Sequence, residues 1–231
     1  MSPALDSRLA LAASLYEPCD TGADIGTDHG LLPCRLLREN ICRRMVLTDI
    51  SPKALAHARA QVEKQGLTDR VEFRCADGLE GLTAPVGCLS ITGMGGKTVA
   101  EMLIRGRDRL GDAVLVLSCH TEQEAARRAV AEIGWHLARE EVCLSGGRYY
   151  LLWRAEKGQQ ALSPRDARLG PLWHEKKNEL TIGYAQRRLW VLRRKAQGLK
   201  SAGAPAPVDQ RLLKDTEEDI AFLTAWLEEG P

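Results

Sequence analysis

The stretch Asp24-Ile25-Gly26-Thr27-Asp28-His29-Gly30 decides the fold, because it joins a short apolar run to a helical pattern through a glycine-containing loop. Glycine at position 26 lets the backbone turn sharply and lets a ligand come close to it. In an open α/β sheet, ligands of the nucleotide type bind at the carboxyl end of the first strand. The loop lacks the GxGxxG grip on a pyrophosphate, so it argues against NAD and for a ligand without a pyrophosphate.

Strands and helices alternate on both sides of this loop. Strands are expected at 22–26, 44–49, 71–75, 89–92 and 113–118, and helices at 5–15, 31–39, 53–65, 98–105 and 122–132. This alternation predicts a parallel sheet with right-handed crossovers. Two later runs, 141–144 and 149–153, flank Ser145-Gly146-Gly147-Arg148 and predict a hairpin that adds an antiparallel strand at the sheet edge.

The pattern changes towards the C-terminus, where residues 169–199 look helical and apolar positions recur every three or four residues. A turn at 201–208 separates this run from a second one with the same spacing. These features predict an antiparallel helical hairpin with a coiled-coil-like seam. We therefore expect two domains, 1–158 and 159–231.

Composition excludes several classes of protein. The 231 residues are 44% hydrophobic, which is enough for a core, and the net charge is only +1. No apolar run approaches the roughly 20 residues of a membrane helix, and we see no signal peptide. The seven cysteines form no CxxC pair, so we expect no metal site and a reducing, cytoplasmic location.

Two aspartates stand at the ends of later strands. Asp49 ends the second strand and can accept hydrogen bonds from both ribose hydroxyls of an adenosine moiety. Asp49 can equally be an acidic residue at the N-terminus of the helix that follows Ser51, and the two roles are compatible. Asp77, with Gly78, follows the third strand and can accept from an adenine amino group, although the same dipeptide is common in ordinary loops.

The segment Gly93-Met94-Gly95-Gly96 follows the fourth strand. Methyltransferases that act on exocyclic amino groups of bases usually carry a polar residue, two prolines and an aromatic residue at this point. The glycines here would let a flat substrate approach the backbone, and Met94 would offer a soft apolar face. The alternative is a tight turn that serves only the strand-to-helix geometry.

Together these motifs resemble the bacterial tRNA (adenine-22 N1)-methyltransferase family, known as TrmK. The resemblance covers nearly the whole chain and is carried by residues 23–33, 49–66, 77–82, 91–96, 147–150 and 169–178. It implies an α/β fold: a Rossmann-like class I methyltransferase sheet followed by a C-terminal α-helical coiled-coil hairpin. It also implies S-adenosyl-L-methionine as cofactor and methyl transfer to N1 of an adenine in the D-arm region of tRNA.

The motifs and the resemblance give two sets of candidate residues. Those expected to bind S-adenosyl-L-methionine are Asp24, Gly26, Asp28, Gly30, Asp49, Ile50, Ser51, Asp77, Gly78 and Gly93, and those expected at the reacting atoms are Asp28, His29, Gly93, Met94 and Gly95. Adenine N1 has a free lone pair at neutral pH, so the enzyme mainly has to align nucleophile, methyl and leaving sulfur. His29 either orients the reactants or is a structural histidine bonded to nearby backbone.

Charge distribution suggests how RNA would bind. Ten Lys/Arg and three acidic residues lie between Arg165 and Lys200, so this segment carries +7 and the rest of the chain −6. With three aromatic residues interleaved, such a helix could track a phosphate backbone, or it could simply be a solvated face. The candidate RNA-binding residues are Arg8, Lys176, Lys177, Arg187, Arg188, Arg193, Arg194 and Lys195.

One departure from the family keeps other functions open. After the fifth strand the family tends to have a Gln-Pro-Asn-like segment, whereas Leu117-Ser118-Cys119 stands here, near the expected substrate pocket. A small-molecule methyltransferase is one alternative, and a non-catalytic RNA-binding protein that keeps the cofactor fold is another. We expect a monomer or a weak homodimer.

Overall fold

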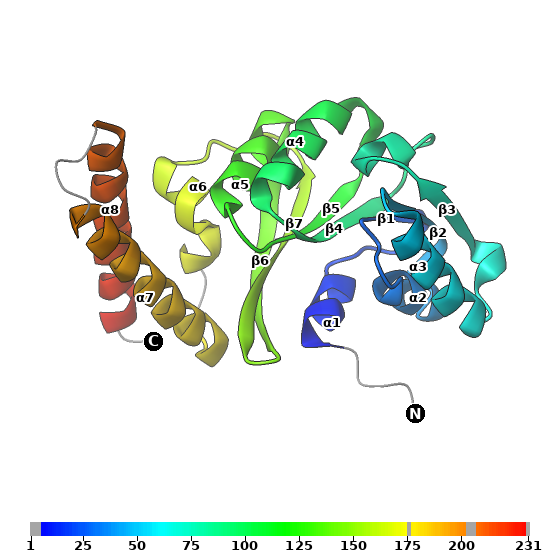
Figure 1. The fold of residues 1–231 in the computed structure, drawn as a ribbon, viewed down its shortest axis with the longest axis horizontal. Helices are drawn as coiled ribbons and strands as arrows, with labels where there is room; N and C mark the ends of the chain where they lie inside the picture. Colours follow the sequence, from blue (N-terminus) through cyan, green and yellow to red (C-terminus); the bar gives the residue numbers. More distant parts are fainter. Residues whose placement is uncertain (1–5, 175–176, 202–206, 230–231) are drawn as a thin grey trace. The chain divides into compact units, whose positions relative to one another are not determined.

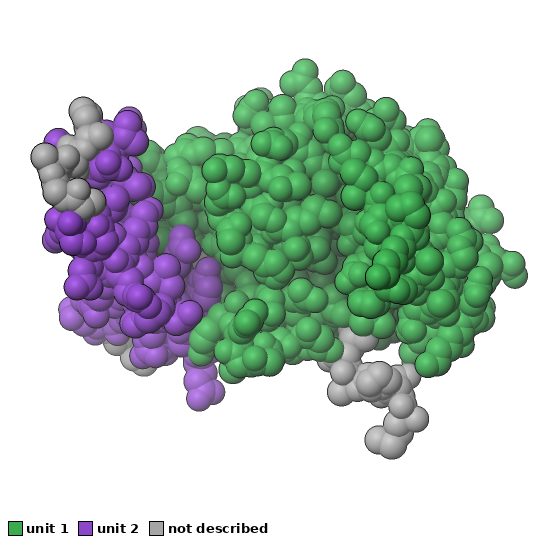
Figure 2. Space-filling model, viewed as in Figure 1, with its two compact units in different colours: residues 1–170 green, residues 171–231 purple. Residues whose placement is uncertain are grey.

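A computed structural model describes residues 6–174, 177–201 and 207–229 of the chain (Figure 1). The chain forms two compact units, residues 1–170 and 171–231 (Figure 2). Each unit has its own packing and is described by itself. None of the helices in the described ranges is long and apolar enough to cross a membrane.

The first unit is built on a seven-stranded sheet with the order β3-β2-β1-β4-β5-β7-β6. The strands are β1 (Cys19–Ile25), β2 (Cys42–Asp49), β3 (Val71–Cys75), β4 (Cys88–Met94), β5 (Val114–Cys119), β6 (Trp135–Ser145) and β7 (Arg148–Lys157). The first five are parallel, and the β6–β7 hairpin adds to β5 with β7 antiparallel, as the sequence predicted. Both hairpin strands are longer than predicted, because pairing continues to Trp135 opposite Lys157.

Helices cover both faces of this sheet. They are α1 (Ser7–Ser14), α2 (Leu31–Arg38), α3 (Pro52–Lys64), α4 (Gly96–Gly106), α5 (Gln123–Glu132) and α6 (Pro164–Leu169), with short 3-10 turns η1 (Thr68–Arg70), η2 (Gly78–Gly81) and η3 (Arg107–Arg109). A further turn, η4 (Pro171–His174), belongs to the second unit. Helices α1, α2 and α3 lie on one face, and α4 and α5 lie on the other (Figure 1). The Ser51 hydroxyl accepts from the backbone N–H of Ala54 at 3.3 Å and Pro52 opens α3, which is the start that the sequence predicted.

The second unit contains the predicted helical hairpin, α7 (Glu179–Ser201) and α8 (Pro207–Glu228). The apolar positions of α7 are buried, among them Leu189, Leu192 and Ala196. The predicted helical run 169–199 is not continuous. Gly170 has a φ of +92° and Pro171 follows it, so α6 ends at Leu169 and α7 begins only at Glu179.

The boundary between the units falls after Gly170, later than the predicted residue 158. The reason is a buried contact between α5 and α6. The fully buried Arg127 guanidinium donates to Glu140 at 2.8 Å and to the carbonyl of Ala167 at 3.2 Å, and it stacks over Trp153. Residues 164–169 therefore belong to the first unit.

Arg127→Ala should lower the free energy of unfolding by about 3–5 kcal/mol, because it leaves the buried Glu140 carboxylate without its guanidinium partner. Arg128→Ala is the matched control: the neighbouring guanidinium is half-exposed and pairs with Glu124 one turn away. That change should cost less than about 1 kcal/mol. Urea unfolding of the two variants measures both effects, and equal losses would contradict this account of the α5–α6 contact.

Candidate functional site

A cavity of about 370 Å³ opens at the carboxyl ends of β1, β2 and β4. The sheet order reverses between β1 and β4, which is the switch point where open α/β sheets bind ligands. The volume of the cavity is in the usual range for a small-molecule site. Eight residues that the sequence analysis singled out line it: Arg8, Asp24, Gly26, Asp28, His29, Asp49, Gly93 and Met94.

The loop after β1 forms the floor of this cavity. The backbone N–H groups of Gly26 and Thr27 donate to the carbonyl of Thr48 on β2, at 2.8 and 3.1 Å. Gly26 has a φ of +72°, and a side chain there would collide with the methyl group of Met94. The turn therefore favours glycine, and Met94 would have to move for any side chain at this position.

Asp24 is a buried carboxyl at the end of β1. The Tyr16 hydroxyl donates to Ser90 Oγ at 2.6 Å, and the Ser90 hydroxyl donates to Asp24. Burial raises the pKa of Asp24 to about 6, although the Ser90 hydrogen bond works in the opposite direction. The Asp24 carboxyl is therefore fixed by Ser90 and Tyr16 on its buried side, and it is charged mainly above pH 6.

Asp49 ends β2 with its carboxylate at the cavity wall. One oxygen accepts from the backbone N–H of Ser51 at 2.8 Å and the other accepts a longer bond, 3.4 Å, from the backbone N–H of Asp28. Each carboxylate oxygen can accept a further hydrogen bond, so two vicinal hydroxyls of a ribose can be bound. These acceptors fit the ribose of an adenosine cofactor, and the predicted role of Asp49 in binding it stays a prediction.

Asp28 and His29 lie at the open side of the cavity. Asp28 has a φ of +45°, an uncommon conformation for a residue with a side chain. The His29 ring stacks on His57 with centroids 5.4 Å apart. The possible ligand atoms of Asp28, His29 and His57 all lie within 4.8 Å of one another, and all three residues are exposed. The expectation of no metal stays a prediction.

The Gly93-Met94-Gly95-Gly96 segment has divided roles. Gly93, with a φ of +87°, and Met94 line the cavity, whereas Gly95 is the N-cap residue of α4. A side chain at Gly96 would collide with the backbone of Glu122, and the Gly96 N–H donates to the carbonyl of Thr121 at 2.9 Å. Gly96 is therefore required by the loop after β5 rather than by a flat substrate.

Several predicted cofactor-binding residues do not line the cavity. The Asp77 carboxylate accepts from Arg105 at 2.7 Å outside it, and Gly78 packs against Met102. Gly30 packs against Ala58 at the start of α2. Ile50 and Ser51, which follow Asp49, also lie beyond the lining. The roles of these five residues in cofactor binding remain predictions.

His120 lines the cavity and was not predicted. It is the first residue after β5. Ligands of open α/β sheets bind at the carboxyl ends of the parallel strands, so the reasoning applied to β1, β2 and β4 would also have found it. The departure at Leu117-Ser118-Cys119 lies within β5, where all three side chains are buried and the Ser118 hydroxyl donates to the carbonyl of Leu151. These three residues do not line the cavity.

The predicted RNA-binding residues fall in two places. Arg8 lies in the first unit, at the cavity and 5.2 Å from the Tyr150 ring centre. In the second unit, Lys177 contacts the Trp226 ring, and α7 exposes a basic face of Arg187, Arg193, Arg194 and Lys195, with Arg188 half-buried. Lys176 lies outside the described residues.

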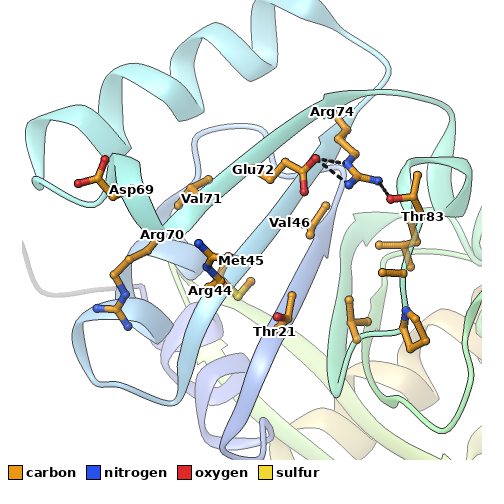
Figure 3. A pocket seen from close by; sticks show the side chains of 14 residues that line it. Thr21, Arg44, Met45, Val46, Asp69, Arg70, Val71, Glu72, Arg74 and Thr83 are labelled. Atoms are coloured by element: carbon orange, nitrogen blue, oxygen red, sulfur yellow. Dashed lines mark hydrogen bonds and ion pairs between the residues drawn. The ribbon is translucent and has the colours of Figure 1, made fainter.

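A second cavity, of about 360 Å³, lies along β2 and β3 (Figure 3). Its arginines already have structural partners: Arg74 pairs with Glu72 at 2.6 Å, and Arg70 donates to two backbone carbonyls of β2. It contains none of the predicted site residues. The cavity at the ends of β1, β2 and β4 is therefore the candidate site.

Comparisons with known proteins identify the family of the first unit. The methyltransferase domain family matches residues 5–153. The tRNA (adenine(22)-N(1))-methyltransferase of Bacillus subtilis is 30% identical over 158 residues, which cover 68% of this chain and just under two thirds (66%) of that protein. The crystal structure of the B. subtilis m1A22 tRNA methyltransferase TrmK has a TM-score of 0.84, at 24% identity over 97% of this chain and 99% of that one. The structure of M. capricolum TrmK in complex with S-adenosyl-homocysteine has a TM-score of 0.80, at 23% identity over 95% of this chain and 99% of that one.

The raised pKa of Asp24 predicts a pH dependence of stability. An acid whose pKa is higher in the folded than in the unfolded state binds its proton more tightly when folded, so its contribution to stability increases as the pH falls through about 6. Between pH 8 and pH 5 the wild type should gain about 1 kcal/mol of unfolding free energy relative to Asp24→Asn. Urea unfolding of both proteins measures the difference, in which shared titrations cancel, and a difference that does not change with pH would contradict the assignment.

Proposed function

The chain belongs to the methyltransferase domain family, and from this premise we propose that it is an enzyme of the TrmK type, which transfers a methyl group from S-adenosyl-L-methionine to N1 of adenine 22 in tRNA. The proposal rests on one observation: four candidate residues from three strands line the same cavity. Asp24 comes from β1, Asp49 from β2, and Gly93 and Met94 from the end of β4. These four residues come from the ends of three strands around the switch point, which is where open α/β sheets bind their ligands.

The residues present fit this cofactor. The Asp49 carboxylate has acceptor capacity for the ribose hydroxyls, and Gly26 itself adds no side chain to the lining. When bound, S-adenosyl-L-methionine supplies the activated methyl group, and its positively charged groups suit a cavity lined by three carboxyls. The roles proposed for Asp28, His29 and Gly93 at the reacting atoms rest on their position along the lining.

Methyl transfer to adenine N1 requires the nucleophile, the methyl group and the leaving sulfur to be aligned, and it does not require a strong base. N1 of adenine attacks with its own lone pair, so no proton has to leave it first. N1 is engaged in a Watson–Crick pair within a helix, so the target adenine has to be unpaired or turned out of the stack. The seven cysteines are free thiols, which supports the predicted cytoplasmic location of such an enzyme.

The basic face of α7 is proposed to hold the tRNA. Helix α7 has six Lys/Arg and one acidic residue, whereas α8 has two Lys/Arg and six acidic residues. Trp190 is exposed between Arg187 and Arg194, whose guanidinium carbons lie 4.5 and 4.9 Å from its ring centre. A half-exposed indole between two cations offers stacking and charge to a nucleic acid.

The activity is tested with unmodified tRNA and labelled S-adenosyl-L-methionine, followed by mapping of the labelled nucleoside. We expect N1-methyladenosine at position 22, and Asp49→Ala should remove the label because the ribose loses its acceptor. Label at another nucleotide would keep the enzyme class and reject the target. Cofactor binding without label on any tRNA would favour a small-molecule methyltransferase or a non-catalytic RNA-binding protein.

The tRNA surface is tested by charge reversal. The double variant Arg193→Glu/Arg194→Glu should weaken tRNA binding at least 10-fold at low salt and flatten its salt dependence, because fewer phosphate contacts release fewer counterions. Arg211→Glu/Lys214→Glu on α8 makes the same change in net charge and is the matched control. Filter binding from low to moderate salt compares them. Equal losses in both variants would mean that only net charge matters and would reject α7 as the tRNA surface.

A further inference from the structure

The loop after β5 holds His120 directly against the turn after β4. The backbone N–H of His120 donates to the carbonyl of Met94 at 3.1 Å. The carbonyl of Thr121, the residue after His120, accepts from the backbone N–H of Gly96 at 2.9 Å. Lys97 and Glu122 add an ion pair across the same junction. The position of the His120 backbone relative to Gly93 and Met94 is therefore set by contacts on both sides.

The side chain of His120 faces the cavity from this anchored position. Its Nε2 atom lies 3.8 Å from the point where a Cβ on Gly93 would be, so the missing side chain at Gly93 leaves the imidazole edge open to a ligand. On its other side the ring makes an edge contact with Tyr150, with ring centres 5.8 Å apart. Arg8, over the same tyrosine ring, completes this side of the cavity.

We propose that His120 positions the target adenine by accepting a hydrogen bond from its exocyclic amino group, through Nε2 of an imidazole protonated at Nδ1. The inference rests on the proposed function, and it names the group that recognises the acceptor base. An acceptor at this point distinguishes adenine, whose amino group lies beside N1, from guanine and uracil, which carry a carbonyl oxygen beside the corresponding ring nitrogen.

The same contact favours the transition state. As N1 attacks, the bond from N1 to the methyl carbon forms, the bond from carbon to sulfur breaks, and its electron pair stays on sulfur. Positive charge then spreads over N1, C6 and the amino nitrogen, so the amino N–H becomes a stronger donor. A neutral acceptor placed there binds the transition state more tightly than the ground state. No proton has to be transferred.

The surroundings of the ring favour its neutral form. Partial burial lowers the pKa of His120, and the positive charges of Arg8 on α1 and Arg148 on β7 lower it further. Tyr150 on β7 also packs against the ring, and Glu122 in the same loop is paired with Lys97. Protonation would remove the acceptor and add a positive charge beside the developing cation, so activity should fall on the acid side.

The test compares four proteins in kcat/KM for tRNA methylation between pH 5.5 and 8.5: wild type, His120→Gln, His120→Leu and the control His136→Gln, whose residue lies on β6 outside the cavity lining. His120→Leu should lose about 100-fold, in the range of one transition-state hydrogen bond. His120→Gln keeps an acceptor that does not titrate, so it should retain activity within about 10-fold and lose the part of the acid-side decrease that belongs to His120. His136→Gln should behave as the wild type.

Binding of S-adenosyl-L-methionine by calorimetry and thermal unfolding show whether each variant is folded and loaded with cofactor. Wild-type activity in a folded His120→Leu variant, or an unchanged acid-side decrease in His120→Gln, would overturn the proposal. If His120→Leu does not fold, the pH profile of His120→Gln still decides. A wild type that binds cofactor but methylates no tRNA would instead overturn the proposed function, and the role of His120 with it.

Discussion

The parallel pairing of β1 with both β2 and β4 is the constraint on which the site depends. Because the chain leaves β1 in one direction and returns to its other edge with β4, no connection covers the carboxyl ends of these two strands. The loop after β1 is held to β2 through Thr48, and the end of β1 is held to β4 through Ser90 and Asp24. The crevice is thus a product of the sheet itself, and the helices only add its walls.

Glycine serves this arrangement in two different ways. Gly26 permits a turn that Met94 closes from the other side, so its role is local and concerns the floor of the cavity. Gly96 lets the loop after β5 contact the start of α4, and in doing so it sets the position of His120. A motif that reads as one glycine-rich segment therefore combines a ligand-facing part, Gly93 and Met94, with a packing part, Gly95 and Gly96.

The sequence predicted the fold and the centre of the site because both follow from local patterns. Alternating strands and helices, the Ser51–Pro52 helix start and the acidic residues at strand ends are visible without tertiary contacts. The unit boundary falls after Gly170 rather than after 158 because the buried Arg127 guanidinium contacts the carbonyl of Ala167, 40 residues away, and nothing in the local composition marks this contact. The pairing of Asp77 with Arg105, 28 residues away, is hidden for the same reason. His120 was missed although its place after a parallel strand made it accessible to the same rule.

The charged and neutral side chains of the cavity suit the movement of positive charge in the proposed reaction. Methyl transfer to N1 moves a positive charge from sulfur to the adenine ring. Asp24 and Asp49 stand at the ends of β1 and β2, where a cationic cofactor is attracted, and His120 stands after β5, where neutrality avoids repelling the charged product. Once the charge has left the sulfur, the carboxyls attract the remaining cofactor less strongly. The groups that would draw the cationic cofactor into the cavity would therefore also favour the release of its product.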